Sequence, residues 1–582
     1  MLCVAFPYST AMLRSRVLVS VVVSSLIVVV ACARTNASSN PPPNVSAALP
    51  PVVTDGRLPR TRAERTSYTE TSHYADVVAF IDSLRRIGAP IAVGSIGTTS
   101  ERREIPYVIA SRPLVSTPDA AHALGRPIVY VQGNIHAGEV EGKEALQALL
   151  RDLVFETKRN VLDSIVLIAV PIYNADGNER FADQARNRGE QNGPALVGQR
   201  PNAQNFDLNR DYMKADAPET QASLAMFNRW NPDFFVDLHT TDGSYHGYAL
   251  TYAPSLNPAG DIGPAFAGGA YVRDSLLPEL RQRVRARRGY ETFDYGNFVS
   301  QDSADRGWFT YDHRPRFGTN YYALRGRMSV LSEAYSHDPF PRRVASTYAF
   351  VSELLSLVAE RGSRIRALSA RADSAVAAWG NGRSSAQIPI RADLTTTPSV
   401  GEVIVENIER TTDTVRTEPG VRRGMRRVGT VRRVRMPVFD RFVATMSAPT
   451  AWGFAFPAAD SSAARLIAMH GIVLERTRND CTASAQMFSA DSVIVSPTAF
   501  QNRRNVRVEG RWQPADIGIE RGTYVVRLAQ PLGVLATYVI EPRSDDGLVA
   551  WNIGDRATAG HLQLSPTRLT TPLPTACGLG PA

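Results

Sequence analysis

Two residues of metal-binding type stand where a predicted strand gives way to a predicted helix. In the stretch VYVQGNIHAGEVEGKEALQALLRDLV, the residues Val129 to Val131 are β-formers in a short apolar run, which predicts a buried strand. From Glu139 onward, leucines recur at helical spacing. His136 and Glu139 lie three residues apart at the intervening turn, where both side chains can point to one place. An imidazole and a carboxylate so placed can supply two zinc ligands, although this spacing alone is a weak signal.

A third residue of the same chemical class follows another predicted strand. His239 comes directly after the mostly apolar stretch Phe234 to Leu238. In open α/β sheets, binding sites gather at the carboxyl ends of strands, and His136 has the same placement. Two histidines and one carboxylate, with a position left for water, form the usual catalytic zinc site. Taken alone, His239 would instead be a hydrogen-bonded residue at a strand end.

Further polar residues crowd the corresponding loops. Asn209 and Arg210 are neighbours in NFDLNRDY, and an arginine fork suits a carboxylate. Arg186 and Arg188 stand in QARNRGEQNGP, and Glu333 follows an apolar run where a carboxylate is unexpected unless it is used. Structural salt bridges would explain any one of these residues, but explain the whole set less well.

Five short motifs occur in an order that resembles the zinc carboxypeptidase family, whose archetype is pancreatic carboxypeptidase A. They are HAGE, NADG, DLNRD, DLHT and LSEAY, and with the upstream segment SERREIPYVIAS the resemblance covers roughly residues 68–337. The resemblance implies one zinc ion per chain, held by His136, Glu139 and His239. It also implies hydrolysis of C-terminal peptide bonds, with a peptide as the substrate.

The same resemblance assigns roles to residues around the metal. Asn209 and Arg210 would bind the terminal carboxylate of the substrate, and Glu333 would be the general base. Asp207 matches an aspartate that orients the first zinc histidine. For the arginine that stabilises the oxyanion we expect Arg188, with Arg186 as its competitor.

One aromatic role is less well defined by the sequence. Spacing back from Glu333 favours Tyr311 as the tyrosine that covers the substrate, with Tyr321 and Tyr322 as alternatives. His246 and His337 also stand near the motifs, and we expect both to be structural.

The pattern of segments predicts an α/β fold with a second, β-rich region. Strand-like and helical runs alternate over residues 67–379, which indicates a mixed, mostly parallel central sheet flanked by helices. The resemblance makes this the carboxypeptidase-like phosphorylase/hydrolase fold. Short β-rich runs fill residues 380–582, which predicts a smaller, all-β, sandwich-like accessory domain. A contact between the arginine-rich stretch Arg422 to Arg435 and an anionic cell-envelope surface is the alternative to a solvated loop.

The N-terminus predicts export. A basic segment precedes the apolar run Val17 to Val30, which is too short for a comfortable transmembrane helix. Residues 1–32 are therefore expected to be a signal peptide, and Val29 to Cys32 resembles a bacterial lipobox that would lipidate Cys32. The alternative is a plain signal peptide cut after the Ala-x-Ala-like sequence ACA. Residues 33–66 would be a Pro/Ser/Asn-rich tether that leaves the protein facing the periplasm or cell surface. Cys481 and Cys577 remain for the mature chain, and an oxidising compartment would allow them to pair.

Composition leaves three functional classes open. The net charge of +9 comes without a nucleic-acid-binding motif, so we expect no nucleic-acid partner. The leading hypothesis is a metallocarboxypeptidase. Its rivals are a zinc amidase or deacylase of the same fold, acting on N-acyl amino acids or peptidoglycan stem peptides, and a catalytically silent binding protein.

Overall fold

The computed structural model describes residues 55–412 and 420–582. The expected signal peptide with Cys32, and the tether as far as residue 54, lie outside the described residues. All described residues fall within one compact unit. In these two ranges, no helix is both long and apolar enough to cross a bilayer.

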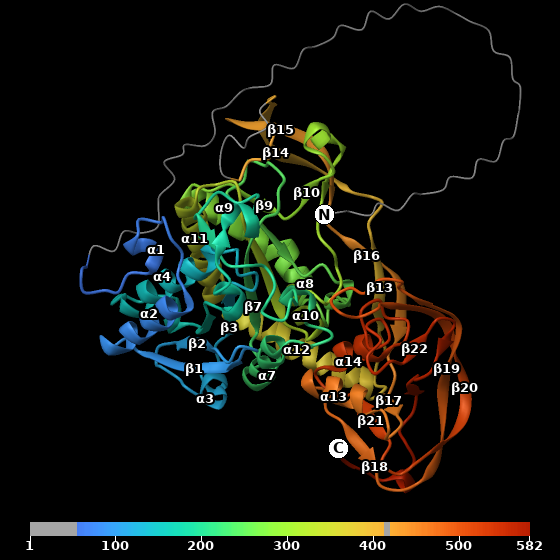
Figure 1. The fold of residues 1–582 in the computed structure, drawn as a ribbon. Helices are drawn as coiled ribbons and strands as arrows, with labels where there is room; N and C mark the ends of the chain where they lie inside the picture. Colours follow the sequence, from blue (N-terminus) through green and yellow to red (C-terminus); the bar gives the residue numbers. More distant parts are fainter. Residues whose placement is uncertain (1–54, 413–419) are drawn as a thin grey trace, which may run out of the picture. The chain divides into compact units, whose positions relative to one another are not determined.

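An eight-stranded mixed sheet forms the centre of the N-terminal part of the described chain (Figure 1). In spatial order its strands are β1 (Ile91–Thr98), β2 (Glu104–Ala110), β4 (Val166–Val170), β3 (Ile128–Gly133), β7 (Phe234–Thr240), β12 (Met328–Ala334), β8 (Leu250–Pro254) and β9 (Thr292–Asp294). The central strands β4, β3, β7 and β12 run parallel to one another. Antiparallel pairs join β1 to β2, β2 to β4 and β12 to β8. The predicted mixed sheet is therefore confirmed.

The central strands are buried along their whole length, and apolar residues make up most of their sequences. Their register brings the functional ends together. Gly133 at the end of β3 pairs with Leu238 on β7, and Glu333 on β12 pairs with His239 on β7. The ligands predicted from separate motifs thus meet at one edge of the sheet.

Helices cover both faces of this sheet (Figure 1). Alternate strand residues point to opposite faces, so Val129 and Val131 join one apolar cluster while Ile128 and Tyr130 join the other. The first cluster is completed by α2 (Tyr74–Arg86), α4 (Glu141–Phe155), α9 (Leu277–Arg288) and α11 (Phe340–Glu360). The second includes α7 (Pro218–Trp230), α10 (Gly318–Leu324) and the last turns of α12 (Gly362–Gly380).

The folded region begins earlier than the predicted boundary at residue 67. Residues 62–65, expected to be tether, form the short helix α1 (Arg62–Arg65) with a Thr61 capping box. Ala63 is fully buried in a cluster with Phe340, and Arg151 Nη1 donates to the Glu64 carboxylate at 2.7 Å. These contacts fix the segment on the sheet domain, which composition alone did not indicate.

The C-terminal part is β-rich, as predicted, but it is not purely β. Its largest sheet has the order β20 (Val506–Ile519), β19 (Cys481–Val495), β24 (Thr567–Leu569), β17 (Gly453–Phe456), β21 (Tyr524–Arg527), β18 (Glu475–Thr477) and β25 (Leu579–Pro581). Two smaller pairs are β13 (Gln387–Leu394) with β16 (Phe442–Pro449), and β22 (Ala557–Thr558) with β23 (His561–Leu562).

Two helices, α13 (Ser461–Met469) and α14 (Gly533–Ile540), correct the all-β expectation for this part. Every residue of α14 is buried, and a short apolar run that is buried on all sides has no period that separates strand from helix. Both helices share an apolar cluster with α7, α10 and α12. The C-terminal part thus packs directly on the sheet domain.

The arginine-rich stretch is a strand, and not the expected solvated loop. It lies mostly on β15 (Met425–Phe439), which pairs with β14 (Ser399–Arg410) in a sheet that also holds β10 (Asn297–Phe298) and β11 (Trp308–Phe309). Glutamates on β14 face several of its arginines, in the pairs Arg433–Glu402, Arg427–Glu406 and Arg426–Glu409. This pairing reduces the charge available for an anionic surface.

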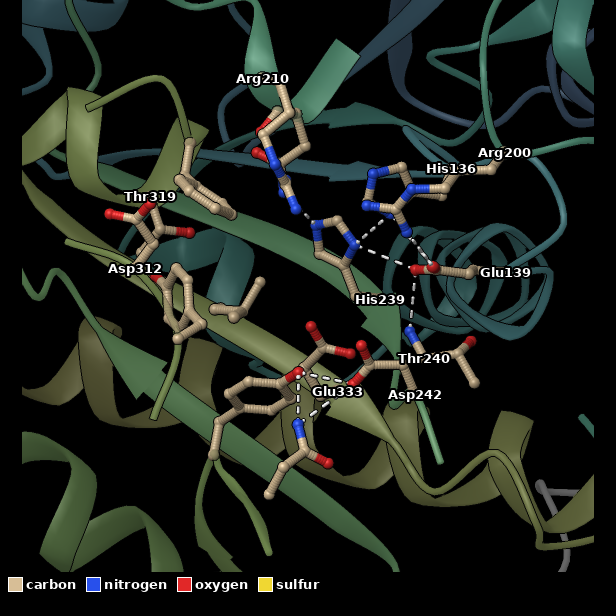
Figure 2. Close-up of a pocket in the computed structure, with 16 residues that line it drawn as sticks. His136, Glu139, Arg200, Arg210, His239, Thr240, Asp242, Asp312, Thr319 and Glu333 are labelled. Atoms are coloured by element: carbon tan, nitrogen blue, oxygen red, sulfur yellow. Dashed lines mark hydrogen bonds and ion pairs between the residues drawn. The ribbon is translucent and has the colours of Figure 1, made fainter. Parts of the chain in front are cut away.

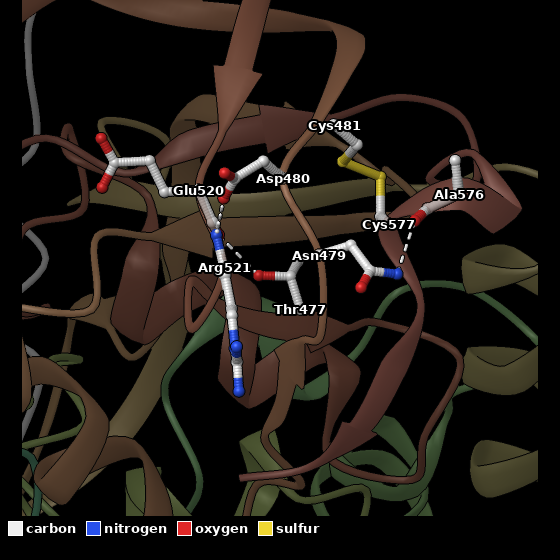
Figure 3. Close-up of a disulfide and its surroundings, with 8 residues drawn as sticks. All are labelled: Thr477, Asn479, Asp480, Cys481, Glu520, Arg521, Ala576 and Cys577. Atoms are coloured by element: carbon white, nitrogen blue, oxygen red, sulfur yellow. Dashed lines mark hydrogen bonds between the residues drawn. A yellow bond between two sulfur atoms is a disulfide. The ribbon is translucent and has the colours of Figure 1, made fainter.

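A disulfide joins Cys481 and Cys577, which are 96 residues apart in the sequence (Figure 3). It ties the start of β19 to the segment that leads into β25. The pairing left open by the sequence is therefore present. The short elements α3 (Pro118–Ala123), α5 (Ala175–Asn178), α6 (Gln184–Asn187), α8 (Gly268–Tyr271), β5 (Ala182–Asp183) and β6 (Leu196–Val197) occupy connections within the sheet domain.

Candidate active site

The turn after β3 positions the first two metal-type ligands. Asn134 has a left-handed backbone conformation (φ 68°), which asparagine adopts more readily than most residues. The chain then brings His136 and Glu139 to the same point (Figure 2). Gly138 between them has no room for a side chain, because a Cβ there would lie 2.7 Å from Arg188 Cγ. The HAGE motif thus needs its glycine for close packing as well as its two ligands.

His239, at the end of β7, completes a three-residue cluster with them. His136 Nδ1 lies 3.1 Å from Glu139 Oε1 and 3.2 Å from His239 Nδ1. His239 Nδ1 lies 3.0 Å from Glu139 Oε2. All three side chains are buried, and their ligand atoms fall within 4.8 Å of one another. The sequence-predicted ligands are therefore brought together.

The outer nitrogen of each histidine faces a protein group, which directs the other nitrogen inward. His136 Nε2 lies 3.0 Å from Asp207 Oδ1, the contact expected of this aspartate. His239 Nε2 lies 3.0 Å from Asp237 Oδ2 and 3.3 Å from Asn209 Nδ2. Such partners fix ring orientation and raise ligand basicity. Asp237 was not predicted, but strand alternation places it on the same face as His239, and this pattern could have identified it.

The donor set fits zinc. Zn–N and Zn–O bonds of about 2.0–2.1 Å in a tetrahedron separate the ligand atoms by roughly 3.3 Å, and the three separations here are 3.0, 3.1 and 3.2 Å. Three protein ligands leave the fourth position open, as in catalytic zinc sites.

Arg188, the arginine expected to stabilise the oxyanion, contacts Glu139 and is not among the residues that line the cleft. Its Nη1 donates to Glu139 Oε1 at 3.0 Å, and its Nη2 donates to the carbonyls of Thr240 and Thr241. Burial opposes ionisation of Glu139, but His136 and Arg188 outweigh it and hold the pKa of this carboxyl well below its usual value. Arg188 thus keeps a metal-type ligand ionised and in place.

Arg200 lies where the sequence analysis expected Arg188. It lines the cleft and approaches Glu139 Oε1 at 3.4 Å through Nη1 (Figure 2). Its Nε donates to Asp207 Oδ2 at 3.0 Å. Arg200 was not among the site residues predicted from the sequence. Its place seven residues before Asp207, in the same loop, was the available signal.

A cavity of about 360 Å³ opens beside the metal-type ligands. Its lining combines cations, carboxylates and aromatic rings, and it includes His136, Glu139, Arg200, Asn209, Arg210, His239, Asp242, Tyr295, Asn297, Tyr311, Asp312, Phe317, Thr319, Leu331 and Glu333. Arg200 and Arg210 make one part of this cleft cationic, whereas Asp242 and Glu333 lie together in another part (Figure 2). The arrangement suits a ligand with an anionic end.

Glu333 reaches the cleft from β12 and faces the metal-type cluster (Figure 2). Burial raises its pKa well above the usual carboxyl value; nearby Glu139 and Asp242 add to this, and His239 opposes it. A carboxylate with increased proton affinity is suited to accept a proton. Its location agrees with the role that the resemblance implied.

Asn209 and Arg210 both line the cleft, in different ways. The Asn209 carboxamide is engaged by the protein, because its Oδ1 accepts the Gly318 N–H at 2.9 Å and its Nδ2 faces His239. The Arg210 guanidinium stacks over the Phe317 ring at 3.9 Å. Its Nη1 donates to the Asn209 carbonyl at 2.9 Å. The guanidinium carries further N–H donors, so Arg210 is the better candidate of the two to bind a carboxylate.

Among the three candidate tyrosines, Tyr311 lines the cleft. Tyr321 and Tyr322 are fully buried in the apolar cluster on the α10 face, which removes them as cleft residues. Tyr295, which the sequence analysis missed, also lines the cleft and donates to Asp242 Oδ1 at 2.9 Å.

His246 and His337 are buried outside the cleft lining, in line with a structural role. His246 Nδ1 accepts the Tyr248 N–H at 3.2 Å, and His337 Nδ1 donates to the Gly420 carbonyl at 3.0 Å. Burial, helped by the nearby charge of Arg427, lowers the pKa of each to about 3.

Comparison with known proteins agrees with this site. Residues 77–261 match the family model described as zinc carboxypeptidase, a span that contains His136, Glu139 and His239. Carboxypeptidase 2 of Trichophyton tonsurans is 30% identical over 145 residues, which is 24% of this chain and 23% of that protein. Carboxypeptidase 2 of Trichophyton rubrum is 28% identical over 163 residues, 28% of this chain and 27% of the relative. Carboxypeptidase D of Mus musculus is 33% identical over 132 residues, 22% of this chain and 9% of the relative.

The chain thus spans about a quarter or less of the length of these three relatives. Among solved structures, a metallo-carboxypeptidase from Burkholderia cenocepacia covers 50% of this chain and 70% of its own, at 16% identity and a TM-score of 0.36. Carboxypeptidase A from Helicoverpa armigera covers 50% of this chain and 74% of its own, at 16% identity and a TM-score of 0.36. Residues 77–261, which contain the ligand set His136, Glu139 and His239, are thus similar to the zinc carboxypeptidase family.

Proposed function

We propose that this protein is a zinc-dependent metallocarboxypeptidase that releases C-terminal residues from peptides. One observation supports this activity above others: Arg210 lines the same cavity of about 360 Å³ as Glu333 and the zinc-type ligands. A carboxylate-binding cation at a fixed distance from the reactive centre selects a bond near a free C-terminus.

The residues of the cleft divide the chemistry among them. His136, Glu139 and His239 would hold a zinc ion, which supplies a Lewis acid and lowers the pKa of water. Glu333 takes the proton of the attacking water and delivers it to the leaving amine. Arg210 binds the terminal carboxylate and so aligns the scissile bond.

Arg200 is placed to stabilise the negative charge that develops on the scissile carbonyl oxygen. Its guanidinium lies in the cleft beside the metal-type ligands and is oriented by Asp207. A preformed cation at such a position is worth several kcal/mol in the transition state.

The test is a comparison of N-blocked dipeptides with a free C-terminal carboxylate against the same peptides with an amidated C-terminus. We expect about one zinc per chain, and a kcat/KM for the amides that is lower by at least about 10²-fold, since Arg210 loses its charged partner. Release of amino acids by mass spectrometry gives the rates. Equal cleavage of both peptide series would contradict an exopeptidase.

Arg200 and Arg188 should respond differently to substitution. We expect Arg200→Ala, at saturating zinc, to lower kcat by about 10²- to 10³-fold, because a charge on the reacting oxygen is left unpaired. Arg188→Ala should instead weaken zinc binding by about 10- to 100-fold, through Glu139, and keep kcat within about threefold at saturating zinc. Metal titration with steady-state kinetics measures both effects. The reverse pattern would return the oxyanion role to Arg188.

An amidase or deacylase of the same fold would need the same ligands and Glu333, and it is the main rival. Zinc with hydrolysis of N-acyl amino acids or peptidoglycan stem peptides, and without cleavage of blocked dipeptides, would favour it. Zinc binding without any hydrolysis would favour a silent binding protein.

We also propose an exported location, with attachment through a lipidated Cys32. The Cys481–Cys577 disulfide supports this, because such bonds persist mainly in oxidising compartments. Export in a bacterial host, followed by detection of the acyl chain on the N-terminal peptide, tests the proposal, and a Cys32→Ser variant is its control.

A further inference from the structure

The tip of the long β19–β20 ribbon touches the metal-side wall of the cleft. The ribbon turns at Gln501 and Asn502, both of which have positive φ values of 51° and 63°. Phe500 and Arg503 close this turn through reciprocal backbone hydrogen bonds of 2.8 and 3.1 Å. The paired positive φ values are those of a tight hairpin turn. The tip is therefore a defined structure and not a loose loop.

The Gln501 side chain makes a specific contact there. Its Oε1 accepts the backbone N–H of Asp207 at 2.9 Å, across 294 residues of sequence. The carboxylate of Asp207 faces His136 Nε2. Asn209 and Arg210 follow Asp207 two and three residues later in the sequence. The C-terminal part thus reaches the backbone that carries both the histidine-orienting carboxylate and the proposed substrate-binding arginine.

Neighbouring contacts hold the ribbon tip in place. Arg503 donates to both carboxylate oxygens of Asp216, at 2.8 and 2.6 Å. A bidentate pair of this kind fixes orientation as well as distance. The ring of Phe500 stacks on Trp551, with centroids 6.1 Å apart. These contacts leave Gln501 to act on Asp207 from a fixed platform.

A second wall of the cleft is held by the same C-terminal part. Arg316 donates to Asp546 from Nε at 2.9 Å, in a buried pair. His313 Nε2 lies 2.9 Å from Asp545 Oδ2. Both anchored residues belong to the loop that bears the cleft residues Tyr311 and Phe317. Each wall that would grip a substrate therefore has a C-terminal anchor.

We propose that Gln501 is a positioning residue of the active site, which acts by fixing the Asp207 backbone so that His136 and Arg210 keep their working geometry. Its removal frees the Asp207 N–H and loosens the turn that leads to Arg210. The inference rests on the zinc site of the proposed function, but metal affinity can be measured whatever the substrate is.

The decisive variants are Gln501→Met, which keeps the length of the side chain and removes the acceptor, and Gln501→Glu, which restores an acceptor oxygen. The matched control is Gln513→Met, the same change at an exposed position on β20. The measurements on the full chain are zinc affinity by competition with a chromogenic chelator, thermal unfolding, and kcat and KM for blocked dipeptides.

For Gln501→Met we expect zinc affinity to fall by about 3- to 10-fold, less than for loss of a direct partner of a ligand. KM should rise by about 5- to 10-fold while kcat at saturating zinc changes less than about twofold, because Arg210 acts mainly in binding. Gln501→Glu should recover both values to within about twofold, and Gln513→Met should match the wild type.

Unchanged zinc affinity and KM in Gln501→Met would overturn the proposal, as would equal defects in Gln501→Met and Gln501→Glu. If Gln501→Met lowers Tm by more than about 5 °C, the Gln501→Ser variant takes its place. The zinc affinity and KM of Gln501→Ser are then judged by the same criteria. A shift in zinc affinity without peptidase activity in any variant would sustain the positioning role and reject the carboxypeptidase assignment. An unchanged affinity rejects the positioning role whatever the activity.

Discussion

Replacing Glu333 with glutamine is expected to lower kcat by about 10³- to 10⁴-fold while zinc content stays at one per chain. Loss of a general base at this scale corresponds to about 4 to 5.5 kcal/mol of transition-state stabilisation. Glutamine has nearly the same shape but cannot accept the proton of the attacking water. Glu333 is not among the three metal-type ligands, so the metal site stays intact.

Stability should not fall with activity in this variant. Burial raises the pKa of Glu333 well above its usual value, so the ionised side chain is unfavourable in the folded protein at neutral pH. Glutamine removes that charge, and we expect the metal-free Tm to equal or exceed that of the wild type. KM should change by less than about threefold, since Arg210 still binds the substrate carboxylate.

Steady-state kinetics, metal analysis and thermal unfolding of the same preparations provide the measurements. Glu360→Gln, at an exposed glutamate at the end of α11, is the matched control and should retain full activity. A Glu333→Gln variant with more than about a tenth of wild-type kcat would show that another group accepts the proton. Asp242, the other carboxylate in that part of the cleft, would then be the next residue to change.

Removal of zinc should have an effect at least as large. Without the ion, water lacks its activation and the scissile carbonyl its polarisation, so we expect chelation to reduce activity by more than about 10⁴-fold. Stoichiometric zinc should restore it. His136→Gln and His239→Gln should each prevent restoration, because neither leaves three ligands for a catalytic site.

Metal binding also has a readout that needs no substrate. At a free zinc concentration about 1,000 times Kd, binding to the native state adds about 4 kcal/mol of stability. For a folded chain of this length we expect the Tm of the protein to rise by roughly 5 °C on zinc addition. The His136→Gln variant should show little of this shift. A zinc-independent Tm and full activity in the presence of chelator would reject a metal site at this position.

The fold of the sheet domain could be predicted from sequence because its signals are local. Mostly apolar runs such as Val166–Val170 and residues 234–238 predict buried parallel strands, and helical periodicity predicts α4 and α11. The C-terminal part was harder. Residues 533–540 form a helix that is buried on every side, so their sequence has no amphipathic pattern to separate helix from strand.

The sequence by itself determined the chemical identity of the site: two histidines and a glutamate beside predicted strand ends, with Glu333 after a third. Those residues lie at or just after the carboxyl ends of strands whose parallel order brings these ends to one edge, so their meeting required no long-range detail.

Only the tertiary structure decided which arginine faces the cleft, which tyrosine lines it, and what lies behind Asp207. Arg188 and Arg200 are both loop arginines near the same motif, and packing sends one behind Glu139 and the other into the cavity. Tyr311 lines the cleft while Tyr321 and Tyr322 enter the core. Gln501 meets Asp207 from 294 residues away. Such placements depend on how separate elements pack, a physical constraint that no local run of residues encodes.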